Sequence, residues 1–179
     1  MKPANHTADL MPSLRSQAFI ALLQLIRRRR IYASAEALEQ SIAEVRRTGP
    51  ALPTRRQHSR LDISVQDRSG HPIFTIRPKV GRQRTAINTD RQVMYLHGGA
   101  YVRPITPFHW QLVEHIVSTT GYTVTVPLYP LAPETSCAQT VPFVVDLIEE
   151  LQQASTNTPL TLIGDSAGGG LAMACSWAL

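Results

Sequence analysis

A short apolar run, residues 160–163, leads directly into the sequence Gly-Asp-Ser-Ala-Gly-Gly-Gly at residues 164–170, and an alanine-rich stretch typical of a helix follows. Residues 164–168 fit the pattern G-x-S-x-G, in which a sharp turn from strand to helix strains the serine and projects its hydroxyl above the sheet. The residues two before and two after the serine then approach closely, which only very small side chains permit. The segment predicts a strand–turn–helix unit with Ser166 at the turn.

Other glycine-rich turns fit this segment less well. A phosphate-binding loop needs a lysine after its glycines, and no lysine follows Gly170. A dinucleotide-binding turn needs the spacing G-x-G-x-x-G after the first strand of its unit, which is absent here. A glycine turn with a purely structural role is the remaining alternative. The pattern and its context favour a serine nucleophile.

A second glycine pair follows another apolar run, in the sequence Y-L-H-G-G-A-Y-V. A serine that attacks an ester creates a tetrahedral oxyanion, which preorganised hydrogen-bond donors must hold. The N–H of Ala167, next to the serine, is one candidate donor, and the loop of Gly98, Gly99 and Ala100 supplies the others. We interpret His97 as a structural histidine whose ring holds this loop, with a role as general base as the alternative.

Three short apolar runs predict strands buried on both faces of a parallel sheet, at residues 92–96, 122–126 and 160–164. Two helical patterns lie between them, one after Thr106-Pro107 and one after Thr140 with a proline in its first turn. Their expected apolar faces are Phe108, Leu112 and Ile116 in the first, and Val144, Leu147, Ile148 and Leu151 in the second. This alternation predicts an α/β fold with right-handed crossovers.

The residues before the sheet contain a hairpin signal and two further helical patterns. Apolar residues alternate over 61–65, the sequence D-R-S-G turns, and H-P-I-F-T-I-R-P runs back. The polar sequence T-R-R-Q-H-S-R, residues 54–60, is interpreted as a link. The two helices begin near Ser13 and Ser34, and their apolar faces are Leu14, Ala18, Leu22 and Leu25 or Ile26 in the first, and Leu38, Ile42 and Val45 in the second, which stops at Gly49-Pro50.

The composition limits the class of protein. With 179 residues, 43% of them hydrophobic and 17% charged, the chain is long enough for one domain with a sizeable core. Its two cysteines, Cys137 and Cys175, match neither a metal-binding spacing nor a disulfide scaffold, so we expect free thiols in a reducing compartment. No stretch approaches the roughly 18 apolar residues of a membrane span, and we find no export signal. We expect a cytoplasmic protein without metal or organic cofactor.

The positive charge is confined to the first part of the chain. All 18 Lys and Arg residues lie at or before Arg103, so the formal net charge of +5 describes that part alone. The run Arg27 to Arg30 is a candidate patch for nucleic acid or an anionic membrane. No aromatic residues interleave with the arginines, as single-strand binding requires. We interpret the run as a solvated helix end and expect no nucleic-acid partner and no stable membrane insertion.

Three motifs occur together in one order: L-H-G-G-A-Y, then Y-P-L-A-P-E at residues 129–134, then G-D-S-A-G-G. In these motifs, and in their spacing, the chain from Leu61 to Leu179 resembles the hormone-sensitive-lipase-like α/β-hydrolases, whose patterns are H-G-G-G-Y/F and Y-R-L-A-P-E. The resemblance implies Ser166 as nucleophile and an oxyanion loop of His97, Gly98, Gly99 and Ala100, completed by Ala167. It also implies that the N-terminal helices belong to a cap over the acyl site.

Three departures from the family pattern stand out. Ala100 replaces the third glycine, which keeps the N–H but restricts φ. Pro130 replaces the usual arginine, so any salt bridge of that arginine is missing. Finally, the family places an acid and then a histidine after the serine, whereas the chain contains neither after Ser166. The upstream histidines do not fit the order of the family, and His109 and His115 are interpreted as solvated or packed helix residues.

At about 30 residues per strand–helix unit, the missing strands and both triad partners would need on the order of 100 further residues. We therefore expect the N-terminal portion of an α/β-hydrolase fold, with a helical cap segment and linker over residues 1–60 and a truncated hydrolase domain over 61–179. With no continuation, the strand at 160–164 becomes an apolar edge, for which we expect self-association.

The expected function is that of a serine carboxylic-ester hydrolase, a carboxylesterase or lipase acting on short- to medium-chain acyl esters through an acyl-enzyme. The chain alone lacks the triad acid and histidine, so we expect it to be nearly inactive. The alternative is a non-catalytic hydrolase-fold protein that binds small apolar ligands under its cap. A basic nucleic-acid-binding module is a more distant alternative.

Overall fold

The computed structural model describes residues 34–79, 87–154 and 157–179. The chain divides into two compact units, residues 1–43 and 44–179. The second unit contains the sheet and all of the candidate site residues. The helix expected after Ser13 and the run Arg27 to Arg30 lie outside the described residues.

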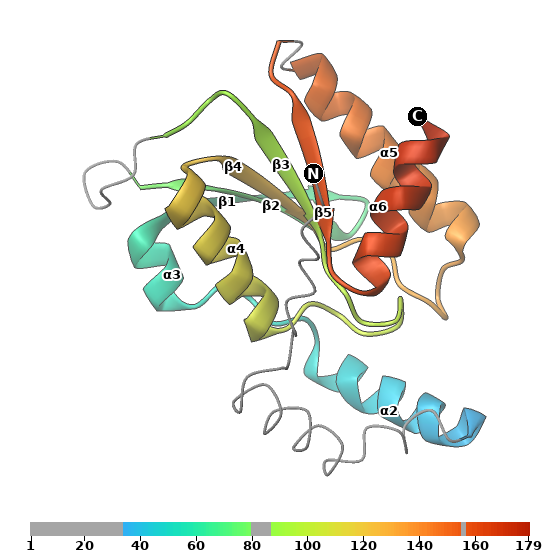
Figure 1. The fold of residues 1–179 in the computed structure, drawn as a ribbon. Coiled ribbons are helices and arrows are strands. Elements are labelled where there is room, and N and C mark those ends of the chain that lie inside the picture. Colours follow the sequence, from blue (N-terminus) through green and yellow to red (C-terminus); the bar gives the residue numbers. More distant parts are fainter. Residues whose placement is uncertain (1–33, 80–86, 155–156) are drawn as a thin grey trace, which may run out of the picture. The chain divides into compact units, whose positions relative to one another are not determined.

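A five-stranded sheet in the order β1-β2-β4-β3-β5 organises residues 44–179 (Figure 1). β1 and β2 form an antiparallel hairpin, β2 pairs antiparallel with β4, and β3 pairs in parallel with both β4 and β5. The predicted hairpin and the three predicted parallel strands are confirmed. The strands are β1 (Leu61–Arg68), β2 (His71–Pro78), β3 (Gln92–Leu96), β4 (Thr123–Pro127) and β5 (Leu160–Gly164).

Helices cover both faces of this sheet, with α4 (Pro107–Thr120) on one side and α5 (Cys137–Ala154) and α6 (Ala167–Ala178) on the other (Figure 1). β3 shows why its sequence is continuously apolar. Val93 and Tyr95 belong to the core that includes residues of α4, whereas Met94 and Leu96 belong to the core that includes residues of α5 and α6. Since successive side chains of a strand point to opposite faces, a strand between two helix layers needs apolar residues at every position.

Two helix starts differ from the prediction. The interpretation of residues 54–60 as a link was wrong, because residues 55–60 form a helix, α3 (Arg55–Arg60). Thr54 caps it, because the Thr54 hydroxyl accepts from the Gln57 N–H and the Gln57 side chain accepts from the Thr54 N–H. Similarly, α5 begins at Cys137 rather than after Thr140, and the Ser136 N–H donates to the Gln139 side chain. The sequences T-x-x-Q and S-x-x-Q mark both of these helix starts, although polar composition alone conceals them.

The predicted apolar face of α4 was wrong at Phe108 and Leu112, whereas Ile116 does pack against the core. Phe108 is 77% exposed and Leu112 is 40% exposed, whereas the buried residues of the helix are Trp110, Val113 and Val117. Position 110 lies roughly opposite 108 on a helix of 3.6 residues per turn. The Trp110 face is buried because the indole is the larger side chain and has partners in the core. The indole packs edge-on against Phe74, with 5.0 Å between the ring centroids, and its N–H donates to the Ala51 carbonyl.

The helix expected at Ser34 is present as α2 (Ala35–Thr48). It ends before Gly49, whose φ of +72° suits the left-handed turn that follows. The apolar positions Leu38, Ile42 and Val45 are half-buried, and no residue of α2 is fully buried.

The described residues offer neither a membrane span nor a metal cluster. No helix among them is both long and apolar enough to cross a membrane. They also contain no group of three or more His, Cys, Asp or Glu side chains arranged to hold a metal ion.

β5 forms one edge of the described sheet and is half-buried at every position. A shallow apolar hollow of about 400 Å³ lies beside it, lined by Leu162 of β5 and by Met173 and Trp177 of α6. Met173 is 76% exposed and Trp177 is 93% exposed. An unpaired apolar edge next to exposed large side chains favours pairing with another chain.

We predict that the 179-residue chain self-associates at micromolar concentration and that the double substitution Met173→Lys, Trp177→Lys shifts it toward the monomer. Both side chains are exposed, so their replacement should leave the fold intact while charges oppose edge pairing. Light scattering coupled to size-exclusion chromatography measures the mass. Phe108→Lys, an equally exposed apolar residue on the other side of the sheet, is the matched control and should change nothing. A monodisperse wild-type monomer would contradict the prediction.

Candidate active site

Ser166 lies on the turn between β5 and α6, as the G-x-S-x-G pattern predicted. Its φ of 50° and ψ of −119° are unfavourable for a residue with a side chain, and the residue is exposed. α6 begins at the next residue, Ala167. The conformation therefore presents the hydroxyl at the carboxyl end of the strand, with the first N–H of the helix beside it.

The glycines around Ser166 allow three backbone segments to touch. A Cβ on Gly164 would overlap the carbonyl group of Gly168, and a Cβ on Gly168 would overlap the Leu96 carbonyl oxygen at the end of β3. Gly169 differs, since a Cβ there would lie 3.3 Å from its nearest neighbour, the Gly164 oxygen. The close approach that the sequence predicted is present, and it also joins α6 to β3.

The loop of residues 97–100 leaves the sheet beside the Ser166 turn, because β3 and β5 are parallel and Leu96 pairs with Gly164. Gly99 has a φ of +137°, and a Cβ there would lie 2.5 Å from the Arg103 oxygen. Ala100 has a φ of +54°, the restriction expected from its replacement of glycine. A left-handed conformation costs a non-glycine residue about 1–2 kcal/mol. The loop retains this conformation despite that strain.

The N–H groups of the loop have different partners. The Gly98 N–H donates to Oδ1 of Asp165 at 2.8 Å, so it is already occupied. Among the described residues, no hydrogen-bond acceptor meets the N–H of Gly99 or of Ala100. These two groups, with the N–H of Ala167 at the start of α6, are the donors that the geometry leaves for an oxyanion.

His97 is buried at 1% exposure and its ring holds the loop. Its Nδ1–H donates to the Gly98 carbonyl at 2.8 Å, and the ring stacks on Tyr129 with 4.6 Å between centroids. The Tyr129 hydroxyl donates to the His97 carbonyl. Burial lowers the pKa of His97 to about 4, although the bond to Gly98 acts in the opposite direction. The contacts support the structural interpretation of this histidine.

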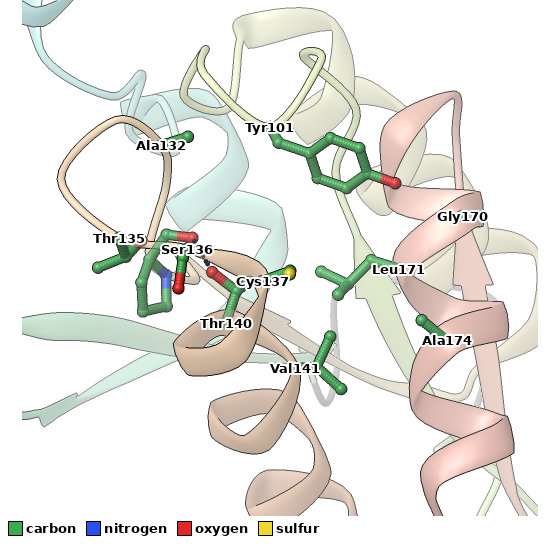
Figure 2. A pocket seen from close by; sticks show the side chains of 11 residues that line it. Tyr101, Ala132, Thr135, Ser136, Cys137, Thr140, Val141, Gly170, Leu171 and Ala174 are labelled. Carbon is green, nitrogen blue, oxygen red and sulfur yellow. Dashed lines mark hydrogen bonds between the residues drawn. The ribbon is translucent and has the colours of Figure 1, made fainter.

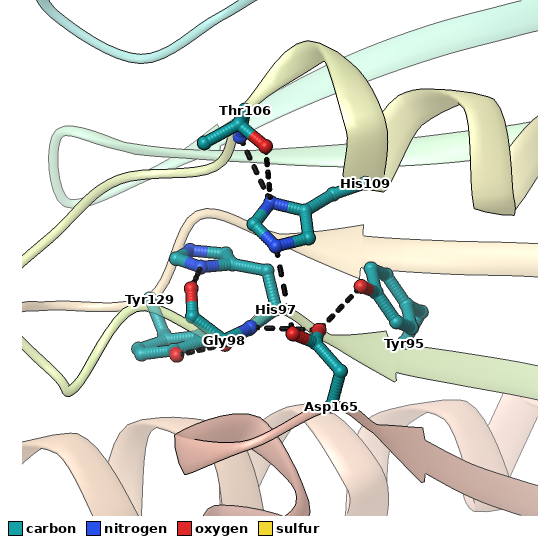
Figure 3. Close-up of polar contacts among 7 residues, drawn as sticks. All are labelled: Tyr95, His97, Gly98, Thr106, His109, Tyr129 and Asp165. Carbon is teal, nitrogen blue, oxygen red and sulfur yellow. Dashed lines mark hydrogen bonds and ion pairs between the residues drawn. The ribbon is translucent and has the colours of Figure 1, made fainter. Parts of the chain in front are cut away.

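Asp165 belongs to the G-D-S-A-G-G motif, but the pattern G-x-S-x-G assigns it no role in the site. Its carboxylate accepts from the Tyr95 hydroxyl at 2.5 Å and from the Gly98 N–H, and it lies 3.5 Å from Nε2 of His109 (Figure 3). Partial burial raises the pKa of Asp165, but these hydrogen bonds and His109 outweigh burial and hold the pKa below its ordinary value. Position x of G-x-S-x-G carries no pattern, so the available signal was only an acid beside the serine.

His109, which the sequence predicts to be solvated or packed, is packed against this carboxylate. The Thr106 N–H donates to Nδ1 of His109 at 2.9 Å, so Nδ1 carries the lone pair and the neutral ring carries its proton on Nε2. Nε2, which carries this proton, lies 3.5 Å from Oδ2 of Asp165. A general base for a serine would need a free lone pair directed at the hydroxyl. The His109 ring therefore caps α4 and lies at ion-pair distance from Asp165.

An apolar pocket of about 290 Å³ opens beside the first turn of α6 (Figure 2). Tyr101, from the loop after Ala100, lies across it, and a Cβ on Gly170 would come within 2.6 Å of the Tyr101 hydroxyl oxygen. Leu171, Ala174 and Val141 form much of its apolar lining, with Cys137 and Thr140 at the start of α5. Gly170 lies one helical turn after Ser166, so the pocket is adjacent to the turn.

The Y-P-L-A-P-E segment supports this pocket through its backbone. The Ala132 N–H donates to the Tyr101 carbonyl at 2.9 Å, and the Thr140 hydroxyl donates to the carbonyl of Pro130 at 3.0 Å. Pro130 stands where the family pattern has an arginine, and Glu134 of the same segment pairs with Arg46 at 2.7 Å. The segment therefore has an arginine partner from another part of the chain.

The fold and the arrangement of the loops are those of α/β-hydrolases. A family model described as "alpha/beta hydrolase fold" matches residues 93–179. A triacylglycerol lipase of Mycobacterium tuberculosis is 39% identical over 89 residues, which are 49% of this chain and 20% of the lipase.

Solved structures of esterases are also similar to this chain. An esterase of the bacterial hormone-sensitive lipase family is 29% identical, with a TM-score of 0.57. The match covers 82% of this chain and 53% of the esterase chain. A mutant esterase is 25% identical with a TM-score of 0.66, covering 95% of this chain and 53% of its own. The chain thus spans about half of these structures and a fifth of the curated lipase. The chain has an α/β-hydrolase fold and is similar to an esterase of the hormone-sensitive lipase family, the resemblance that the three motifs indicated.

The close contact of Gly168 with β3 predicts a large difference between two neighbouring substitutions. Gly168→Ala should lower the free energy of unfolding by about 2–3 kcal/mol or more, because backbone atoms must move to admit the methyl group. Gly169→Ala should stay within about 1 kcal/mol of wild type, since a helix favours alanine over glycine. Urea denaturation followed by circular dichroism measures both. Equal effects of the two substitutions would show that the contact between α6 and β3 tolerates a methyl group.

The burial of His97 predicts a pH-dependent stability. Its pKa is about 4 in the folded chain and 6.5 as the ordinary value, so the unfolded chain binds more protons between these values and stability falls as the pH falls. Between pH 7.5 and 4.5 the loss should be about 2.5 kcal/mol. His97→Phe keeps an aromatic ring but cannot titrate, so its profile should be flatter by this amount, whereas the exposed His115→Gln should follow wild type. Identical profiles for wild type and His97→Phe would contradict this.

Proposed function

We propose that the chain carries the nucleophile and the oxyanion donors of a serine carboxylic-ester hydrolase that acts on short- to medium-chain acyl esters. Ser166 attacks the ester carbonyl. The N–H groups of Gly99, Ala100 and Ala167 stabilise the oxyanion. The bond from the acyl carbon to the ester oxygen then breaks, the alcohol leaves with the serine proton, and water hydrolyses the acyl-enzyme on Ser166 to release the acid. His97 and Gly98 hold the loop in place. The observation that carries the proposal is the strained, exposed Ser166 beside three N–H groups without acceptors in the described chain.

The apolar pocket under Tyr101 supports an ester with a small acyl chain. A pocket of about 290 Å³ is near the lower end of the usual range for small-molecule sites. Its lining is largely aliphatic, with the Thr140 hydroxyl already bonded to a carbonyl. The relatives named above are esterases and a lipase, which is consistent with an ester substrate.

A general base for Ser166 is the missing part. No acid or histidine follows Ser166 in the sequence, and the ring of His109 presents its proton rather than its lone pair toward Asp165. In a comparable triad, removal of the histidine lowers kcat by about 10⁶. We therefore propose that the 179-residue chain alone is nearly inactive. Cys137 and Cys175 are both free thiols, and we propose a reducing, cytoplasmic setting.

A second candidate is a non-catalytic protein of this fold that binds small apolar ligands. The same pocket favours it, because the pocket lining comes from Tyr101, the segment 130–136, α5 and α6 and does not include Ser166. Binding there would not need a general base. The two candidates differ in whether Ser166 is required for what the protein does.

Chemical rescue of the missing base tests the proposal. Imidazole added to the 179-residue chain should accelerate release of p-nitrophenol from p-nitrophenyl butyrate, because a free imidazole can take the Ser166 proton. Ser166→Ala should abolish this increment and leave only the reaction of imidazole itself. Mass spectrometry should find a butyryl group on Ser166 of the wild-type chain. A series from acetate to palmitate should show the highest rates for the shorter esters.

Ser176→Ala is the matched control, since Ser176 is exposed on the same helix and bonds only to the Ala172 carbonyl. It should behave as wild type. A wild-type rate equal to that of Ser166→Ala at every imidazole concentration would rule out the serine mechanism. Rapid turnover without imidazole would show instead that the chain contains a base of its own.

A further inference from the structure

The carboxylate of Asp165 contacts β3, the loop that follows it and α4, all of which lie far before Asp165 in the sequence (Figure 3). Its Oδ1 accepts from the Tyr95 hydroxyl of β3 at 2.5 Å and from the Gly98 N–H at 2.8 Å. Its Oδ2 lies 3.5 Å from Nε2 of His109 on α4. Asp165 directly precedes Ser166. The loop that carries the donors is therefore joined to the serine through the Asp165 side chain and the peptide bond between Asp165 and Ser166.

The partners of this carboxylate are themselves held in place. Tyr95 is fully buried, and burial together with Asp165 raises the pKa of its phenol, so the hydroxyl stays protonated and donates. His109 is fixed by the Thr106 N–H at its other ring nitrogen. A Cβ on Gly98 would overlap the carboxylate, so a glycine at this position lets the loop come this close to Asp165.

We infer that Asp165 is a positioning residue that sets the place of the Gly99 and Ala100 N–H groups relative to Ser166. Its bond to Gly98 fixes the loop one residue before the first free donor. A bond to an ionised acceptor is roughly twice as strong as a neutral one, which suits a strained loop containing Ala100 at positive φ. This inference rests on the proposed function in so far as the donors serve an oxyanion.

Precise placement matters because an oxyanion donor acts only when it points at the charge that develops. A displacement of about 1 Å can lower a rate by 10²-fold. The other hydrogen bonds of the loop join it to itself and to Tyr129 and Ala132. They are the bonds of the His97 ring and carbonyl, those from the Val102 and Arg103 N–H groups to the Gly99 carbonyl, and that from the Ala132 N–H to the Tyr101 carbonyl. The bond from the Gly98 N–H to Asp165 is the one that joins the loop to the residue before Ser166.

Amide hydrogen exchange tests this inference directly. It is resolved by NMR in the chain with Met173→Lys and Trp177→Lys, which we expect to be shifted toward the monomer. A hydrogen bond to a charged group contributes about 1.5–3 kcal/mol, so Asp165→Ala should speed exchange at Gly98 by roughly 10- to 100-fold relative to the amides of β4. The amide resonances of Gly99 and Ala100 should move with it. Asp165→Asn keeps the shape and one acceptor, so it should give smaller changes of the same sign. It also carries the test if Asp165→Ala does not fold.

Asp146→Asn is the matched control, because it removes a carboxylate of α5 that faces Arg68, away from the turn. It should leave Gly98, Gly99 and Ala100 unchanged. If both Asp165 variants alter exchange and resonances at these three amides no more than Asp146→Asn does, Asp165 does not position the loop and the inference is wrong.

The imidazole-dependent reaction with p-nitrophenyl butyrate adds a functional measurement. Asp165→Asn should lower the Ser166-dependent rate at saturating ester by about tenfold or more without changing KM, since the donors act in the transition state. An unchanged maximal rate with altered KM would overturn the positioning role. If wild type shows no Ser166-dependent rate, the proposed function fails, whereas the exchange experiment still decides whether Asp165 positions the loop.

Discussion

The parallel pairing of β3 with β5 determines the geometry around Ser166. Leu96 pairs with Gly164 at the last position of both strands, so the two glycine-rich segments leave the sheet at the same edge and side by side. α6 then passes over the end of β3 so closely that Gly168 meets the Leu96 carbonyl. Neither loop could face the other if the register slipped by one residue, because such a slip also exchanges the two faces of a strand.

The elements of the fold could be predicted because their patterns are strong. Continuous apolar runs identify β3, β4 and β5, and the hairpin alternates until its turn. What the sequence did not reveal was the choice between two apolar faces of one helix. In α4 both the Phe108 side and the Trp110 side are apolar, and only the partners, Phe74 and the Ala51 carbonyl, decide which is buried. Periodicity is a property of one helix, whereas burial depends on the side chains and backbone groups of the element that packs against it.

The candidate site was predictable where it depends on backbone and not where it depends on side-chain contacts. Glycines and a serine at fixed spacing indicate a strained turn, and the structure has that turn. The engagement of the Gly98 N–H could not be foreseen, because it depends on a carboxylate 67 positions away. The same holds for His109, whose capping bond to Thr106 is local but whose approach to Asp165 is set by the packing of α4 on the sheet.

The sheet also divides the apolar interior into two separate clusters, one that includes residues of α4 and one that includes residues of α5 and α6. Side chains without shared partners contribute to stability almost independently. The pocket lining at Val141, Leu171 and Ala174 belongs to the α5–α6 side, whereas the helix that carries His109 packs on the other. Natural sequence variation can therefore reshape the pocket without disturbing the packing behind Asp165. A fold built on this plan can change the lining of that pocket while the Ser166 turn stays the same.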